Sequence, residues 1–119
     1  MSQAKIIREE AKVADRVLSA VLLDMKNCCI VFLSEGEESL GTLAVALPQQ
    51  PGMLGPPLSS TLLGERNINL SRLLAERLAH STKKMVLVSV FVRTMDEREA
   101  GRAFLELLER SMKKMGDLK

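Results

Sequence analysis

The arrangement of apolar positions predicts at least three buried strands. Residues 28–33, 42–47 and 85–92 are apolar on both alternating faces, which is typical of strands that are covered on both sides. In the third segment, one set of side chains is purely apolar and the other includes a serine. The first set is Val86, Val88, Val90 and Val92, and the second is Met85, Leu87, Ser89 and Phe91.

Two segments have the periodicity of amphipathic helices. The first covers residues 68–82, with Asn67 or Asn69 available to cap its first turn. The second begins within residues 94–99, where Thr94 with Glu97, or Asp96 with Glu99, fits a capping box. The apolar stripes are Leu70, Leu73, Leu74 and Leu78 in the first helix, and Ala100, Ala103, Phe104, Leu107, Leu108, Ser111, Met112 and Met115 in the second.

Residues 4–25 fit two different structures. Ile6, Ile7, Ala14, Val17 and Leu18 fall at helical spacing, so the local pattern favours a helix. Residues 17–23 are also a β-branched apolar run, and the polar stretch 24–27 after them suits a hairpin turn. The periodicity leaves both structures open.

Residues 48–57 form the clearest loop, because they hold all four prolines of the chain. A short extended segment follows and is closed by Gly64. The chain has 119 residues, which is close to the commonest domain size. We therefore expect residues 1–119 to form a single domain.

The strands require cover on both faces of their sheet, and the two secure helices shield only one face. At about 25 cal/mol per Å², an open patch of about 600 Å² would forgo roughly 15 kcal/mol of burial, as much as the whole net stability of a domain. Either residues 4–23 form a third helix on the second face, or a partner protein covers it. We expect a partner.

Composition and charge exclude several classes of protein. Apolar residues make up 46% and charged residues 27% of the chain, which argues against disorder. Only 3% are aromatic and the net charge is +2, so nucleic-acid binding is not expected. No apolar run approaches the length of about 18 residues that suggests a membrane span. Cys28 and Cys29 are adjacent and suit reduced thiols, so we expect a cytoplasmic protein that also occurs in the nucleus.

The residues needed for catalysis or metal binding do not occur together in the sequence. His80 is the only histidine and falls on the polar side of the helix at 68–82, which is unsuitable for activating a nucleophile. A lone histidine and two neighbouring cysteines do not give zinc-ligand spacing. We therefore expect no enzyme activity, no cofactor and no metal. An enzyme that uses Cys28 or Cys29 is the weakest of the hypotheses considered.

Two segments carry a resemblance to a known family. They are "SSTLLG" at residues 59–64 and "LAERLAHSTKKMVLVS" at residues 74–89. Together they resemble the fourth member of the proteasome-assembling chaperones. The matching positions are Leu62, Leu63, Gly64, Leu74, Ala75, Arg77, Leu78, Ala79, Thr82, Lys84, Val86, Val88 and Ser89.

The resemblance implies an α+β fold, with a single antiparallel sheet of about five to six strands and amphipathic helices on one face. It implies strands rather than a helix at residues 4–23. It also implies that the other face pairs with a related small subunit or with a second copy of the chain, and that the dimer binds proteasome α-type subunits and promotes formation of the α-ring.

The pairing face can also be predicted from the strand at residues 85–92. Its side with Ser89 and Arg93 is the more polar, which suits an interface between separately folded partners. We therefore predict a dimer interface that includes Met85, Leu87, Ser89 and Phe91. The alternative to a chaperone is a dimeric scaffold or adaptor module of the roadblock or longin-like kind. A helix at residues 4–23 would favour that scaffold, and strands there would favour the chaperone.

Overall fold

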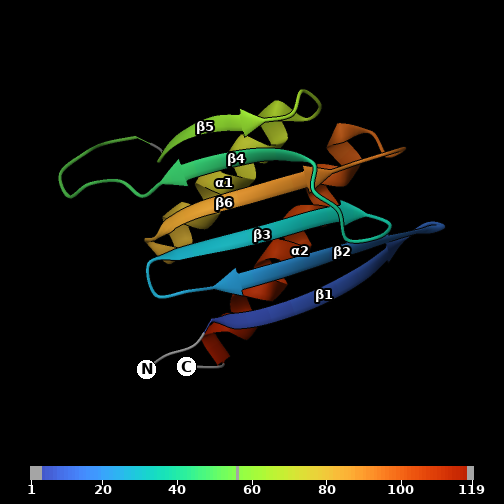
Figure 1. Ribbon diagram of the computed structural model, residues 1–119, viewed down its shortest axis with the longest axis horizontal. Helices are drawn as coiled ribbons and strands as arrows, with labels where there is room; N and C mark the ends of the chain where they lie inside the picture. Colours follow the sequence, from blue (N-terminus) through green and yellow to red (C-terminus); the bar gives the residue numbers. More distant parts are fainter. Residues whose placement is uncertain (1–3, 56, 118–119) are drawn as a thin grey trace.

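The computed structural model describes residues 4–55 and 57–117 and has one six-stranded sheet with two helices (Figure 1). The strand order across the sheet is β1-β2-β3-β6-β4-β5. This confirms the α+β class. The strands are β1 (Lys5–Val13), β2 (Arg16–Asp24), β3 (Cys28–Glu35), β4 (Thr42–Leu47), β5 (Leu58–Leu63) and β6 (Met85–Phe91), and the helices are α1 (Ile68–Thr82) and α2 (Glu97–Asp117).

The expectation of a purely antiparallel sheet is wrong at one position, because β3 and β6 are parallel. All other neighbouring strands are antiparallel. The chain between β3 and β6 contains β4, β5 and α1, and a crossover that includes a helix returns the chain to the sheet in the same direction. The sheet is therefore mixed.

Both helices pack on the same face of the sheet. Helix α1 lies against β4, β5 and β6, and α2 lies against β1 and β2. In Figure 1 both helices lie behind the strands. The shortest dimension of the molecule is 20 Å, which leaves room for one helix layer and one sheet but not for a third layer.

The helix suggested by the local pattern of residues 4–25 is wrong, and the strands implied by the resemblance are confirmed. Strands β1 and β2 form a hairpin whose last pair is Val13 with Arg16, so the turn consists of Ala14 and Asp15. Ala14 adopts a φ of 56°, a left-handed conformation that glycine or asparagine usually supplies. Because alanine is uncommon in this conformation, Ala14 does not mark the turn in the sequence as glycine or asparagine would.

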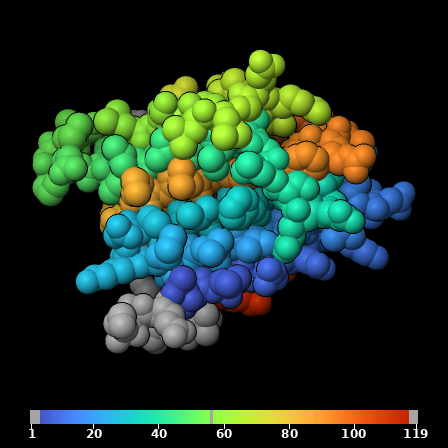
Figure 2. Space-filling model, viewed as in Figure 1, coloured from blue at the N-terminus to red at the C-terminus, as the bar shows by residue number. Residues whose placement is uncertain are grey.

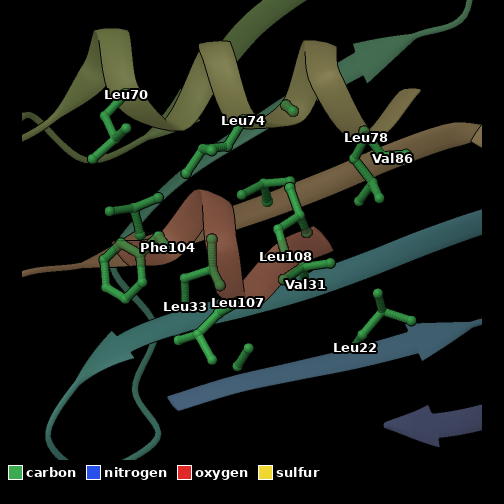
Figure 3. Packing of buried hydrophobic residues seen from close by; sticks show 14 of the residues in the cluster. Leu22, Val31, Leu33, Leu70, Leu74, Leu78, Val86, Phe104, Leu107 and Leu108 are labelled. Atoms are coloured by element: carbon green, nitrogen blue, oxygen red, sulfur yellow. The ribbon is translucent and has the colours of Figure 1, made fainter. Parts of the chain in front are cut away.

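The hydrophobic core lies between the helices and the sheet (Figure 3). Phe104, Leu107 and Leu108 of α2 are fully buried and point towards Leu22, Val31 and Leu33 of the strands. Helix α1 contributes Leu70, Leu74 and Leu78, but Leu73, which the sequence places in the same stripe, is 63% exposed.

One close backbone approach and one polar contact explain why part of the matched sequence pattern is needed for folding. Gly64 has a φ of +97°, and a Cβ atom there would lie 2.6 Å from the Cα atom of Thr42. Lys84 Nζ donates to Asp24 Oδ1 and to the carbonyl oxygen of Met25, both at 2.7 Å. The first contact closes the β5–α1 turn on β4, and the second ties the start of β6 to the β2–β3 turn.

Glu35 holds the segment that connects β6 to α2. Its Oε1 atom accepts hydrogen bonds from the backbone N–H groups of Arg93, Thr94 and Met95, at 2.9, 2.9 and 3.0 Å. The Thr94 hydroxyl donates to Oε2. Burial acts to raise the pKa of Glu35, but these hydrogen bonds outweigh it and lower the pKa to about 2. Asp96 then caps α2, because its Oδ1 accepts from Glu99 N at 2.9 Å.

A second buried carboxylate ties α2 to the edge strand. Glu9 of β1 faces the helices and pairs with Lys114 and with Arg110, whose Nη2 lies 2.7 Å from Glu9 Oε1. The hydrogen bond from Lys114, and then that from Arg110, hold the pKa of Glu9 below its usual value in spite of burial.

Substitution of Gly64 should measure the close approach of the β5–α1 turn to β4. We expect Gly64→Ala to lower the free energy of unfolding by more than about 2 kcal/mol, because the left-handed backbone alone costs about 1–2 kcal/mol for alanine and the added Cβ meets Thr42. Gly52→Ala is the matched control, since Gly52 also has a positive φ but has open space around it. Urea denaturation of both variants makes the comparison, and equal losses would contradict the steric explanation.

The depressed pKa of Glu35 makes stability depend on acid pH. The stabilisation is complete above the ordinary carboxyl pKa of 4.5 and is lost as the pH falls towards about 2, where the folded-state carboxylate protonates. We expect Glu35→Gln to lower stability at pH 7 by about 2 kcal/mol, the scale of hydrogen bonds to a charged group. Thermal unfolding between pH 7 and pH 2.5 should show a smaller acid-dependent loss in this variant than in the wild type. If the variant lost stability in acid as steeply as the wild type, Glu35 would be excluded as a source of the acid-dependent loss.

Candidate protein-interaction face

One face of the sheet has no helix over it, and we call it the open face. Strand register places the buried residues Val86, Val88 and Val90 on the helix side, next to Val31 and Leu33. The alternate side chains of every strand therefore point to the open face. Its apolar members are Ile6, Val17, Val21, Leu23, Ile30, Phe32, Leu43, Val45, Leu47, Leu58, Leu63, Met85, Leu87 and Phe91.

The open face has an apolar centre and, along strand β1, a charged border. Its middle is formed by β3, β6 and β4, which contribute Ile30, Leu87 and Val45. Strand β1 at the sheet edge contributes the charged residues Arg8, Glu10 and Lys12 as well as Ile6. Arg8 pairs with Glu38 at 3.1 Å. Figure 2 shows this face, with the strands exposed to the viewer. An apolar centre with a polar rim is typical of protein interfaces.

The four predicted interface residues all lie on this face, but they are not equally accessible. Met85 is 39% exposed, and Leu87 and Phe91 are half-buried among their neighbours. Ser89 is fully buried, and its Oγ accepts a hydrogen bond from Gly41 N at 2.8 Å. Three of the four side chains are therefore accessible on the open face, and the fourth is used inside the chain.

The connection between β3 and β4, residues 36–41, covers one end of the open face. It crosses in front of β6 (Figure 1) because β4 lies on the far side of β6 from β3. Ser39 N donates to Ser34 Oγ at 3.0 Å, and Leu40 remains 57% exposed. A shallow hollow lined by Val21, Phe32, Glu38, Ser39 and Leu40 lies beside the connection. The sequence pattern gave no sign of this part of the face.

The loop at residues 48–57 extends the same apolar surface beyond the sheet. It joins β4 to β5 and projects from the end of the sheet (Figure 1); Pro56 lies outside the described residues. Leu54 is 97% exposed and Met53 is 52% exposed. Leu47 and Leu58, at the two ends of the loop, belong to the open face. Exposed leucines in a loop that adjoins an apolar face indicate a contact surface.

The residues that sequence reasoning considered for chemistry are not brought together. Burial raises the pKa of Cys29 to about 12, which keeps the thiol protonated. Cys28 is half-buried on the open face, and His80 is exposed on α1. Among residues 4–55 and 57–117, no three His, Cys, Asp or Glu side chains are grouped as a metal site requires. No helix in that part of the chain combines the length and the hydropathy needed to cross a bilayer.

Comparisons with known proteins agree with this architecture. A family model described as proteasome assembly chaperone 4 matches residues 18–92, which is more than half of the chain. Among solved structures, a chain from a chaperone complex for yeast 20S proteasome assembly superposes with a TM-score of 0.67. The alignment covers 96% of each chain at 15% sequence identity, and at that identity it shows the shared fold. No curated protein sequence matches the chain.

The two cysteines should differ in reactivity. We expect the folded, unpaired chain to expose one reactive thiol, that of Cys28, because Cys29 is fully buried and its pKa of about 12 suppresses the thiolate. Titration with a disulfide reagent at pH 8, before and after addition of denaturant, should count one thiol and then two. Cys28→Ser is the control and should abolish the native reaction. Rapid labelling of both thiols in the folded protein would contradict the placement of Cys29.

Proposed function

Because this chain belongs to the proteasome assembly chaperone 4 family, we propose that it is one subunit of a dimeric chaperone that binds proteasome α-type subunits and promotes formation of the α-ring. The family is one of chaperones and not a class of enzymes. Its mate in this proposal is a related small chaperone subunit or a second copy of the chain. Both cysteines are unbridged, which supports a cytoplasmic or nuclear location.

The apolar open face is the observation that carries the proposal. A sheet that exposes Leu87, Phe91 and Val45 at its centre gains free energy when a second apolar surface excludes water from it. The charged residues of β1 at the border suit the rim of such an interface. The solved relative was itself found in a chaperone complex, which supports a chaperone mate for this chain.

The open face offers three of the four residues at 85–91 to a mate directly. Met85, Leu87 and Phe91 contact it in this proposal, whereas Ser89 shapes the face by holding the backbone of Gly41. The roadblock or longin-like alternative is less favoured, since it called for a helix at residues 4–23 and strands β1 and β2 occupy that segment.

A charge placed at the centre of the open face should break the dimer. We expect Leu87→Glu to weaken pairing by at least about 100-fold, because burying an unpaired charge costs several kcal/mol and about 2.7 kcal/mol corresponds to that factor. Native mass spectrometry of the chain, alone and with its mate, measures the change. Leu47→Glu with Met85→Glu is a second variant, because both side chains are already partly exposed and the folded chain tolerates polar groups there. Leu73→Glu, on the helix side, is the matched control and should leave pairing intact.

Affinity purification from the native cell tests the chaperone role. We expect the tagged wild-type chain to recover proteasome α-type subunits without mature β-type subunits, and the Leu87→Glu variant to recover much less. Recovery of no proteasome component by the wild-type chain would overturn the proposed function.

A further inference from the structure

A groove between the two helices lies on the side of the molecule opposite the open face. It has a volume of about 590 Å³ and is lined by residues from both helices, with Leu70, Leu73 and Leu74 of α1 and Leu105 of α2 forming its apolar part. Leu70 and Leu74 also belong to the core, whereas Leu73 is 63% exposed. A leucine exposed in a concave apolar surface indicates a contact made with another molecule.

The groove exists because the helices meet closely at one place and rest on different parts of the sheet. The ideal Cβ position on Gly101 lies only 3.0 Å from Leu70 Cδ1, so glycine permits the close approach of α2 to α1. Helix α1 packs on β4, β5 and β6, and α2 packs on β1 and β2. Gly101 lies in the interior of α2, where glycine costs about 1 kcal/mol relative to alanine. The close contact with Leu70 accounts for a glycine at this position.

The charges on the groove are mainly positive. Its lining includes Arg77, Arg98 and Arg102 against the single carboxylate of Glu97. Arg77 already binds Glu109 at 3.0 Å. Within the described residues, neither Arg98 nor Arg102 lies at ion-pair distance from a carboxylate. Two guanidinium groups beside an apolar floor are therefore available to carboxylates of a partner.

The other side of the same two arginines is acidic. A second hollow is lined by Arg98 and Arg102 together with Asp96, Glu99 and Glu106. Glu99 is engaged by Arg16 at 3.6 Å. Arg98 and Arg102 therefore line both hollows, and the apolar leucines lie in the groove between the helices.

We propose that this groove binds an acidic amphipathic helix of the client α-type subunit. The apolar side chains of that helix contact Leu73 and Leu105, and its carboxylates pair with Arg98 and Arg102. The inference rests on the proposed function. The open face is occupied when the chain is paired, so the client needs a different surface, and the groove lies on the far side of the sheet. A helix laid in an apolar groove is a common mode of peptide recognition, and the charges select an acidic one.

Binding of purified α-type subunits to the assembled dimer tests the groove. Each α-type subunit is produced separately and titrated against the wild-type dimer and against dimers that carry Leu73→Asp, or Arg98→Glu with Arg102→Glu. We expect each change to weaken binding at least 10-fold, and the double arginine variant to show a smaller salt dependence than the wild type, because two charge contacts are removed. Lys113→Glu, an exposed charge reversal on α2 outside the groove, is the matched control and should bind as the wild type does.

The outcomes separate the two proposals. If the wild-type dimer binds no α-type subunit, the proposed function fails and the groove inference fails with it. If the wild-type dimer binds and both groove variants bind equally well, only the groove inference is overturned. If Leu73→Asp abolishes self-association of the chain instead of client binding, the groove is occupied by a second copy and the inference is also overturned. Native mass spectrometry of each variant establishes whether it is still a dimer, so that a loss of client binding is not mistaken for a loss of pairing.

Discussion

A sheet that is covered by helices on one face only is the constraint on which the rest of this structure depends. Helices α1 and α2 hide one surface of the six strands, and the chain is only 20 Å thick in that direction. The other surface keeps leucine, isoleucine, valine and phenylalanine side chains at its centre. No further element of the described chain covers them except the short connection 36–41 at one end. The free energy of burying this surface is thus available to association and is not spent in folding.

The covered face depends on two buried carboxylates that act over long distances in the chain. Glu35 at the end of β3 organises the start of α2 by accepting three backbone N–H groups. Glu9 in β1 receives Arg110 and Lys114 from the other end of the same helix. Together they fix α2 over β1 and β2, which α1 does not reach. Buried charges are tolerated there because each is paired or hydrogen-bonded.

These contacts also explain what could be predicted from the sequence. Strands β3, β4 and β6 and both helices have strong local periodicity, and each was predicted to within a few residues.

Strand β1 was not evident, because Glu9 faces the core and Ile6 faces outward, so apolar and polar residues do not alternate. The partners of Glu9 lie about 100 residues away, beyond the reach of any local pattern. Ala14 in the left-handed turn removed the remaining signal of a hairpin. Alternation along β6 predicts which of its side chains lie on the open face. The cover provided by residues 36–41 depends on the strand order, which no local sequence pattern gives.

The open face and the groove between the helices differ in physical character. The open face is apolar at its centre, so association through it is driven by apolar burial, which salt does not screen as it screens ion pairs. The groove between α1 and α2 is lined by two arginines that lie at the surface, where ion pairs contribute little each and are screened by salt. If the proposed mate occupies the open face and the proposed client occupies the groove, the first contact depends mainly on apolar burial and the second partly on charge, so the second is the more sensitive to salt.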